Sequence, residues 1–385
     1  MNVMPDSSIA VTPEMYNDVR QPLAKAQTLP PWTYTSEEFY HIEIERIFRK
    51  VWNCIGRVER IPDPGSYFTL DFAGVPLIVV RDNENTVRAF ANSCRHRGTM
   101  VASGEGQCRT FTCPYHSWTY DLQGRLISAP TEMDKTEDFH LDNHGLVPIR
   151  LETWAGFIFI TFNDSAESLD TYLGDLPNLV APYALDQLVC VRRRFYDVAC
   201  NWKVYLENTK DQLHVTSVHR TSLNRVAPPM KMNRQVQETH GNYVSSFLEV
   251  PGSMALLKGE EGFPKLPSLE GAALQRTTTP VVLPTVYIGC TIDCAYYLRI
   301  QPVGVDRIVL EQGGMFPREV IERPDFGTRA KGYYKRWDTT AREDNDVCEL
   351  QQRGLTSPFA CPGRFSHREE ILHRISNWII DRILE

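Results

Sequence analysis

Residues 94–117 read CRHRGTMVASGEGQCRTFTCPYHS, and this stretch decides the fold predicted for the first half of the chain. One residue separates Cys94 from His96, sixteen residues follow, and two residues then separate Cys113 from His116. Each arm of the motif therefore offers one thiolate and one imidazole. A 2Fe-2S cluster with two cysteines on one iron and two histidines on the other needs this distribution of ligands. We expect these four residues to hold such a cluster.

A structural zinc site is the rival interpretation of the same four residues. Zinc sites with two Cys and two His usually place the cysteines on one arm and the histidines on the other. The mixed arms favour the cluster. Two neutral imidazoles in place of thiolates raise its reduction potential, which suits an acceptor of electrons from a ferredoxin or a reductase. Cys108 fits neither arm and is interpreted as a small buried hydrophobe.

Composition and charge indicate an ordinary folded protein. Of the 385 residues, 42% are apolar and 23% are charged, and 41 basic minus 48 acidic residues give a net charge of −7. No stripe of Lys or Arg indicates a nucleic acid or an anionic membrane as a partner. The first twenty residues lack a secretory signal, the longest apolar stretch is too short for a membrane span, and ten cysteines are too sparse for a disulfide scaffold. We therefore expect a cytoplasmic protein.

The order of predicted elements indicates an α+β chain of two domains after an N-terminal segment. Residues 1–52 hold that segment and a helix over 36–52 capped by Ser36. Between 53 and 165, short β-branched and aromatic runs alternate with turns, which predicts antiparallel hairpins. Helix and strand signals mix over 166–385.

Within this last region we expect two kinds of regular element and one long loop. The predicted strands lie near 189–199, 280–287, 296–302 and 307–316. One helix is predicted near 167–173, a second from Trp202 onward, and a third after a capping box of Ser366 and Glu369. The loop spans 251–270.

A second constellation lies in residues 201–219, NWKVYLENTKDQLHVTSVH, which contain Asp211, His214 and His219. Two neutral imidazoles and one carboxylate on one face leave positions open on Fe(II) for water, O2 and a nearby substrate. Asp211 and His214 are one helical turn apart, whereas His219 would diverge on a regular helix, so we expect a distortion near 216–218. The alternative is a pair of surface or hydrogen-bonded histidines on an amphipathic helix, and the first motif shifts the balance toward metal binding.

These motifs carry a resemblance to a known family. CRHRG followed by CPYHSW resembles the Rieske motif of aromatic-ring-hydroxylating oxygenases, and NWK, Glu207-Asn208 and Asp-x-x-His-x-x-x-x-His resemble the mononuclear iron segment of that family. The resemblance covers the chain from about Phe39 to the C-terminal helix. It implies the alpha, or terminal oxygenase, subunit of a Rieske non-haem iron oxygenase. The fold implied is an antiparallel β Rieske domain over 53–165 and a catalytic domain of helix-grip (START/SRPBCC-like) type over 166–385.

The resemblance implies roles for the residues of the second constellation. His214 and His219 would bind the mononuclear iron. Asp211 would serve catalysis as a bridge, accepting hydrogen bonds from His214 and from His116 of a neighbouring subunit, which would couple the two redox centres. Asn208 matches a family asparagine near the iron.

The third iron ligand implied by the resemblance is a carboxylate from the C-terminal half. The stretch AREDNDVCELQQRGL contains Glu343, Asp344 and Asp346. Its place before Gln352-Arg353 resembles the third-ligand segment of the family, in which Asp344 matches best and Asp346 is the reserve.

The implied reaction is reductive activation of O2 and oxygenation of a small organic substrate. Electrons from NADH would arrive through a separate reductase, with or without a ferredoxin, and no dinucleotide-binding glycine motif in this chain suggests that NADH binds here. The family is typically a ring of three alpha subunits, so we expect a homotrimer or an alpha3beta3 assembly. A non-catalytic Rieske electron-transfer protein fused to a ligand-binding domain is the alternative of another class.

The substrate is less well defined by the sequence. Candidates for the pocket are Val281, Leu283, Tyr287, Ile288 and Tyr296. The segment with Asp as the bridge resembles aromatic-ring hydroxylases, whereas QRGLTSPF with PGRFSHREE resembles members that oxidise quaternary ammonium compounds, where aromatic cages would hold the cation. We expect mono- or dioxygenation of an aromatic substrate in aromatic hydrocarbon catabolism. The alternative is oxidative N-demethylation or C–N cleavage of a betaine-type compound.

Overall fold

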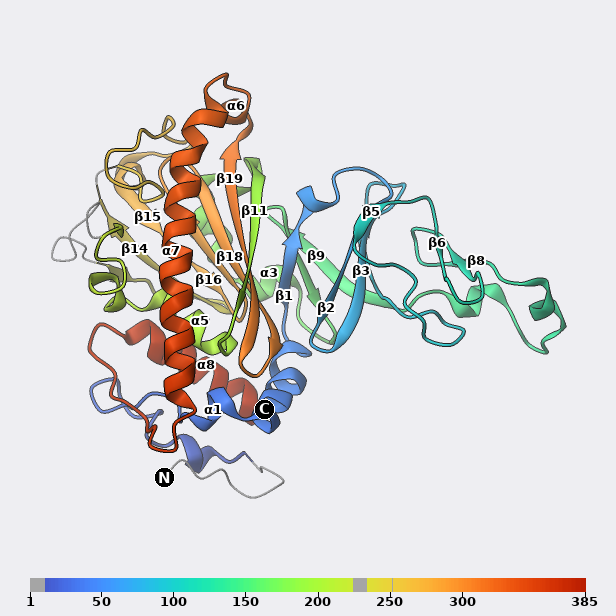
Figure 1. Ribbon diagram of the computed structural model, residues 1–385, viewed down its shortest axis with the longest axis horizontal. Coiled ribbons are helices and arrows are strands. Elements are labelled where there is room, and N and C mark those ends of the chain that lie inside the picture. Colours follow the sequence, from blue (N-terminus) through green and yellow to red (C-terminus); the bar gives the residue numbers. More distant parts are fainter. Residues whose placement is uncertain (1–10, 224–233, 251) are drawn as a thin grey trace. The chain divides into compact units, whose positions relative to one another are not determined.

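The computed structural model describes residues 11–223, 234–250 and 252–385, which divide into two compact units (Figure 1). The smaller unit is Arg49–Leu169. The larger unit combines the chain up to Phe48 with Asp170–Glu385, so the N-terminal segment joins the second half of the chain by its contacts. The predicted α+β class, with an antiparallel β domain followed by a domain of mixed helices and strands, is confirmed.

The smaller unit is made of antiparallel strands joined by short turns. Its strands are β1 (Asn53–Arg57), β2 (Ser66–Phe72), β3 (Val75–Arg81), β4 (Val87–Ala91), β5 (Glu105–Gln107), β6 (Phe111–Thr112), β7 (Thr119–Tyr120), β8 (Leu126–Ser128), β9 (Pro148–Trp154) and β10 (Phe157–Thr161). Seven strands form a sheet in the order β1-β10-β9-β4-β3-β2-β5, and β6, β7 and β8 form a second sheet. One core cluster packs Ile78 and Phe90 against Trp118 and also contains Cys94 and Cys113. Both predicted cluster cysteines therefore lie in the apolar core.

The larger unit contains an antiparallel sheet. Its strands are β11 (Leu188–Val198), β12 (Gln235–Val236), β13 (Tyr243–Val244), β14 (Ser246–Glu249), β15 (Arg276–Thr278), β16 (Val281–Val282), β17 (Val286–Cys290), β18 (Ala295–Gly304) and β19 (Arg307–Pro317). The order is β11-β19-β18-β17-β15-β14-β12, with β13 paired to β16 and β16 to β17. The predicted strands near 189–199, 296–302 and 307–316 are confirmed, and the run at 280–287 divides between β16 and β17.

Helices cover this sheet, and the longest crosses its face in Figure 1. The helices are α1 (Trp32–Thr35), α2 (Glu37–Glu43), α3 (Leu169–Leu173), α4 (Leu176–Val180), α5 (Trp202–Lys210), α6 (Arg318–Ile321), α7 (Phe326–Leu355) and α8 (Glu370–Leu384). Residues 252–270 form no helix or strand, as predicted for the long loop. Across the described residues, none of the helices has the length and apolar composition that a bilayer span requires.

The ends of two helices differ from the predictions. Ser36 caps α2 as predicted, accepting a hydrogen bond from the Phe39 N–H at 3.1 Å, but the helix widens into a π-turn at Ile44 and ends at Phe48. The C-terminal helix begins at Glu370 instead of at the predicted capping box. Only half of that box forms, because Glu369 Oε2 accepts from the Ser366 N–H at 2.6 Å while Ser366 Oγ accepts from Arg368.

Close packing between α7 and β19 fixes the position of the long helix. A Cβ atom at Gly314 would collide with the ring of Trp337, which is fully buried, so glycine is needed for this approach of helix and strand. Thr340 and Asp344 follow Trp337 by three and seven residues and therefore lie on the same face of the helix. The contact at Gly314 thus sets how far these two side chains reach toward the sheet.

A buried ion pair ties α2 to the start of α5. Lys203 Nζ lies 2.5 Å from Glu43 Oε1, both side chains are fully buried, and the indole N–H of Trp202 donates to Glu43 Oε2 at 3.0 Å. Burial raises the pKa of Glu43 and lowers the pKa of Lys203, and their mutual attraction opposes both shifts. The network anchors the helix whose far end leads into the second constellation.

We predict that Glu43→Leu lowers the free energy of unfolding by about 3–5 kcal/mol, because it leaves the Lys203 ammonium buried without its partner. The double variant Glu43→Leu/Lys203→Met should recover a large part of that loss, since it removes both charges. Urea denaturation followed by circular dichroism measures the difference. Equal stability of the single variant and the wild type would contradict the assignment of this pair as an anchor.

Candidate functional site

Two tight loops of the smaller unit present the predicted cluster residues. In the loop after β4, the Gly98 N–H donates to the Cys94 carbonyl at 2.8 Å, and Gly98 has a φ of 76°. In the loop between β6 and β7, the Ser117 N–H donates to the Cys113 carbonyl at 3.0 Å, and Ser117 has a φ of 58°. Each loop therefore begins at a cysteine, encloses one histidine and closes with a residue in the left-handed region.

The two cysteines of these loops are buried, and the two histidines face each other. Cys94 and Cys113 are free thiols, 3% and 1% exposed, while the Nδ1 atoms of His96 and His116 face each other at 3.0 Å. The His96 ring stacks on Trp118, with centroids 5.0 Å apart and planes inclined by 7°. Two buried thiols and two converging imidazole nitrogens fit a 2Fe-2S cluster bound by cysteines on one iron and histidines on the other.

The second constellation begins where α5 ends. The prediction that Asp211 and His214 share one turn of the helix from Trp202 is wrong, because α5 stops at Lys210 and Asp211 has extended backbone angles. Asp211 Oδ1 accepts from the Leu213 N–H at 2.7 Å and Asp211 Oδ2 from the His214 N–H at 3.2 Å. The carboxylate thus starts a new 3-10 turn at His214, and the distortion comes earlier than expected.

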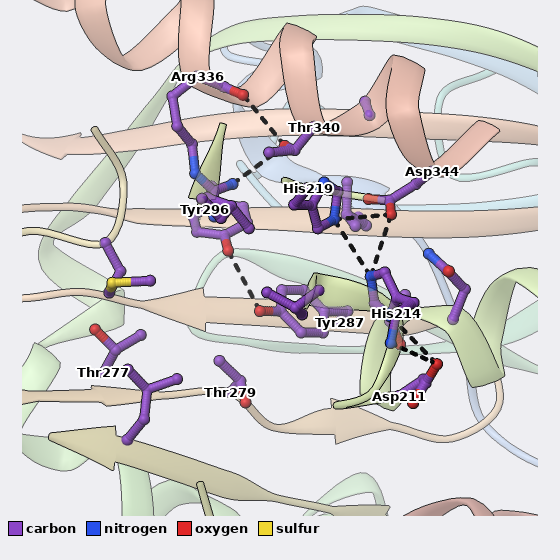
Figure 2. Close-up of a pocket in the computed structure, with 18 of the residues that line it drawn as sticks. Asp211, His214, His219, Thr277, Thr279, Tyr287, Tyr296, Arg336, Thr340 and Asp344 are labelled. Atoms are coloured by element: carbon purple, nitrogen blue, oxygen red, sulfur yellow. Dashed lines mark hydrogen bonds and ion pairs between the residues drawn. The ribbon is translucent and has the colours of Figure 1, made fainter. Parts of the chain in front are cut away.

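Three side chains from two distant segments meet at one point (Figure 2). His214 Nε2 and His219 Nε2 are 3.2 Å apart, and Asp344 Oδ1 on α7 lies 3.5 Å from the first and 3.1 Å from the second. Ligand atoms of the three residues all lie within 4.8 Å of one another. Asp346, the reserve candidate, is exposed on α7.

The arrangement is the one that a divalent metal needs. Asp344 Oδ1 is buried and receives no well-aligned hydrogen bond within the described part of the chain. Burial would raise the pKa of Asp344, but the two histidine rings outweigh burial and lower it. Burial would likewise lower the pKa of His214, but Asp211 and Asp344 raise it to about 9. A proton thus occupies the metal-free site at neutral pH, and the two-His, one-carboxylate set fits Fe(II) with further positions open.

A carboxylate that the sequence did not single out supports this centre. Glu343 Oε2 lies 2.7 Å from His219 Nδ1 and accepts from the Ser222 hydroxyl at 2.6 Å. Such a partner on the second ring nitrogen fixes the tautomer and orientation of the imidazole. Glu343 stood in the acidic run of the sequence, but only the three-dimensional approach of α7 to His219 separates its role from that of Asp344.

Asp211 lies on the opposite side of the His214 ring. Its Oδ2 atom is 3.4 Å from His214 Nδ1, which is near enough for attraction, but Nδ1 makes no well-formed hydrogen bond with any described residue. The pKa of Asp211 is lowered despite burial, because His214 and the backbone N–H groups favour the carboxylate. Asp211 is therefore an anion beside the ring and stands outside the set of three converging atoms.

A pocket opens beside the three converging side chains. Its lining includes the three converging residues, together with Asn208 of α5, Tyr287 of β17, Tyr296 of β18 and Arg336 of α7. Of the pocket candidates from the sequence, Tyr287 and Tyr296 line it. Val281, Leu283 and Ile288 are buried elsewhere in the core.

Comparison with protein families gives two matches. Residues 185–385 match the ring hydroxylating alpha subunit (catalytic domain), and residues 51–144 match the Rieske [2Fe-2S] domain. The first match contains the three converging residues of the larger unit. The second contains both loops with their Cys and His pairs.

Individual relatives align over different shares of the chain. The glycine betaine monooxygenase oxygenase subunit of Chromohalobacter salexigens is 27% identical over 98% of this chain and 91% of its own length. The chloroplastic choline monooxygenase of Spinacia oleracea is 30% identical over 94% of this chain and 80% of its own. The benzene 1,2-dioxygenase subunit alpha of Pseudomonas putida is 32% identical over 66% of this chain and 59% of its own.

Solved structures share the fold. A quaternary ammonium Rieske monooxygenase described for carnitine oxidation superposes with a TM-score of 0.80 at 24% identity, over 96% of this chain and all of that one. Naphthalene 1,2-dioxygenase from Rhodococcus sp. superposes with a TM-score of 0.78 at 21% identity, over 97% and 99% of the two chains. Since enzymes with different substrates are equally similar, this likeness establishes the fold alone.

We predict that Asp344→Ala lowers the iron content from about three atoms per chain to about two, because it removes one of three converging ligands and leaves the cluster loops untouched. Asp346→Ala, two residues away and exposed, is the matched control and should keep all of the iron. Iron analysis together with the visible absorption of the cluster measures both effects. Loss of the mononuclear iron from Asp346→Ala and its retention in Asp344→Ala would show that Asp346, and not Asp344, is the third iron ligand.

Proposed function

This chain belongs to the alpha subunits of the Rieske non-haem iron oxygenases, and we propose that it is the terminal oxygenase of a monooxygenase system for small quaternary ammonium compounds. One observation carries the proposal: of the three sequence relatives described above, the glycine betaine and choline monooxygenases align along nearly the whole chain, whereas the benzene dioxygenase aligns over two thirds of it. The comparisons thus favour the quaternary ammonium alternative over the aromatic substrate expected from the sequence.

The proposed reaction hydroxylates a carbon bonded to the quaternary nitrogen. Substrate, O2, two electrons and two protons give the hydroxylated substrate and one water. A carbon that carries both hydroxyl and ammonium releases the tertiary amine and an aldehyde, which is formaldehyde when the carbon was an N-methyl group. Oxidation of one NADH by a separate reductase, directly or through a ferredoxin, balances the two electrons.

In this proposal His214, His219 and Asp344 hold the mononuclear iron. When bound, the iron supplies a centre for the reduction of O2, and the 2Fe-2S cluster held by the Cys and His pairs supplies electrons one at a time. Glu343 and Ser222 keep the His219 ring turned toward the metal through the hydrogen bonds at 2.7 and 2.6 Å. All three residues line the pocket, so a substrate in the pocket would lie beside the iron.

The aromatic side chains of the pocket provide a surface for a cation. Tyr287 and Tyr296 are 7% and 6% exposed, their ring centroids are 5.9 Å apart, and their hydroxyls lie 3.3 Å apart. Burial raises the pKa of Tyr287, so its ring is neutral with an electron-rich face. Tyrosine faces attract alkylammonium groups, most strongly where water is excluded.

Asp211 is the residue that we propose links the two redox centres. It lies beside the His214 ring and away from the three ligand atoms, and the family resemblance pairs this aspartate with His116 of a partner subunit. The proposal therefore includes a ring of three chains, with or without beta subunits, in a reducing cytoplasm. Asn208, which lines the pocket, is proposed as a further residue of the active site.

A second candidate function is hydroxylation of an aromatic ring. Two observations favour it: the match to the benzene dioxygenase alpha subunit and an aspartate at the proposed bridging position, which resembles aromatic-ring hydroxylases. A non-catalytic electron-transfer role is less well supported than either oxygenase function, because the chain belongs to a family of oxygenases.

The two candidates differ in what they consume. We predict that the iron-loaded protein with a surrogate reductase takes up O2 and oxidises NADH when a trimethylammonium compound is added, with formaldehyde or another aldehyde formed in step with NADH. Benzene and benzoate serve as the comparison substrates. Coupled turnover of the aromatic compounds, with no response to any quaternary ammonium compound, would establish the second candidate in place of the first.

Asp211→Asn tests the link between the redox centres. We expect normal iron content and normal reduction of the cluster by dithionite. Reoxidation of the cluster by O2 and substrate in a single turnover should slow at least about 100-fold, because the amide no longer accepts from both rings. Stopped-flow absorption of the cluster measures the rate, with Asp346→Asn as the control. An unchanged rate in Asp211→Asn would show that electrons take another path.

A further inference from the structure

Arg336, a cation in the pocket, forms no ion pair with any residue that the structure describes. Arg336 of α7 lines the pocket and is only 6% exposed. Its Nη1 donates to Thr340 Oγ1 at 3.3 Å, and its guanidinium carbon lies 5.1 Å from the centre of the Tyr296 ring. Its Nε–H is buried without a hydrogen-bond partner, and within the described part of the chain no carboxylate oxygen lies within 4.0 Å of it.

A buried guanidinium without a carboxylate is costly for the protein alone. Arginine stays protonated in proteins, so Arg336 cannot shed its charge on burial as a lysine can. Removing a charge from water without a paired anion costs several kcal/mol, and ring contact and one long hydrogen bond recover only part of that. The charge is compensated once an anion enters the pocket.

Further donors line the same pocket. The hydroxyl of Thr277, 3% exposed, has no hydrogen-bond partner among the described residues and can donate a hydrogen bond. Arg234 brings a second guanidinium to the lining, with Nη1 donating to the Lys210 carbonyl at 3.4 Å. A carboxylate takes two parallel N–H donors from an arginine fork and still has acceptor sites for a hydroxyl.

The pocket is lined by groups of both charges. Its acidic lining residues are Asp211 and Asp344, both at the metal centre, and its permanent cations are Arg234 and Arg336. Figure 2 shows Arg336 and Tyr296 on one side of the view, with His214 and Asp344 on the other. A substrate that carried positive charge alone would meet repulsion from both arginines.

We infer that Arg336 binds a carboxylate of the substrate, so that the preferred substrate is a zwitterion with a carboxylate as well as a quaternary ammonium group. This inference rests on the proposed function and narrows it. The carboxylate pairs with the guanidinium beside Tyr296, and the ammonium group lies against the tyrosines with an N-bonded carbon toward the metal centre. A cation with a hydroxyl in place of the carboxylate leaves Arg336 unpaired and is a poor substrate.

Binding to the anaerobic, iron-loaded protein tests the inference. The probes are glycine betaine, its methyl ester and choline. Calorimetry on the anaerobic protein gives the dissociation constant of each probe, and a separate aerobic assay of O2 uptake gives its KM. Wild type should bind glycine betaine roughly 10- to 100-fold more tightly than the other two, the range expected of a charge-assisted hydrogen-bond pair. Arg336→Met should lose this preference by weakening glycine betaine alone, and Arg336→Lys should retain part of it.

Matched controls separate this role from a structural one. Arg353→Met removes an exposed arginine from the same helix and should leave all three affinities unchanged. Thermal unfolding and iron content show whether Arg336→Met is folded, and Arg336→Lys supplies the comparison if it is not. Equal binding of glycine betaine and choline by the wild type, or an equal loss for all three probes in Arg336→Met and Arg336→Lys, overturns the inference.

Failure of the inference and failure of the proposed function give different results. Turnover of choline and the methyl ester as efficient as that of glycine betaine overturns the inference and keeps the proposed function. Turnover of benzoate without any response to ammonium compounds overturns the proposed function and the zwitterion with it. In that case, selective loss of benzoate binding in Arg336→Met still places the carboxylate at Arg336.

Discussion

The structure depends on one convergence: two imidazoles from the turn after α5 meet a carboxylate from the middle of α7. The three atoms lie 3.1–3.5 Å apart, a separation that is unfavourable for a buried carboxylate without ordered donors and favourable for a metal ion. Two other contacts in the larger unit position the helices that carry or precede these residues. The Glu43–Lys203 pair anchors the start of α5, and the close approach at Gly314 sets the distance of α7 from the sheet.

The convergence also separates the side chains that we propose as metal ligands from those that contact a ligand ring. Adjacent carboxylates on α7 point to different atoms of the same site: Asp344 toward both Nε2 atoms, and Glu343 toward the far nitrogen of His219. Asp211 stands in the same relation to His214, on its Nδ1 side. Each imidazole therefore has a carboxylate on the side away from the three converging atoms. Glu343 fixes the orientation of the His219 ring by a hydrogen bond, whereas Asp211 is an anion beside the His214 ring.

Local patterns were sufficient to predict part of this site. The spacing of the Cys and His pairs and of His214 and His219 marked these residues without the fold, and the family resemblance favoured Asp344 over Asp346; the structure brings His214, His219 and Asp344 together. Glu343 and Ser222 were not marked in this way, because their roles depend on how α7 approaches residues more than one hundred positions earlier. Arg336 was missed because its position beside Tyr296 depends on how α7 packs on β18. The end of α5 at Lys210 was missed for a related reason: the side chain of Asp211 competes for backbone N–H groups that a continuing helix would use.

Iron-edge anomalous diffraction from crystals of the iron-loaded protein tests the central claim most directly. We expect one isolated iron within bonding distance of His214 Nε2, His219 Nε2 and Asp344, facing the pocket, and a pair of irons bound by Cys94, His96, Cys113 and His116. An anomalous map without density among His214, His219 and Asp344, or with an ion closed off by a fourth protein ligand, would contradict it.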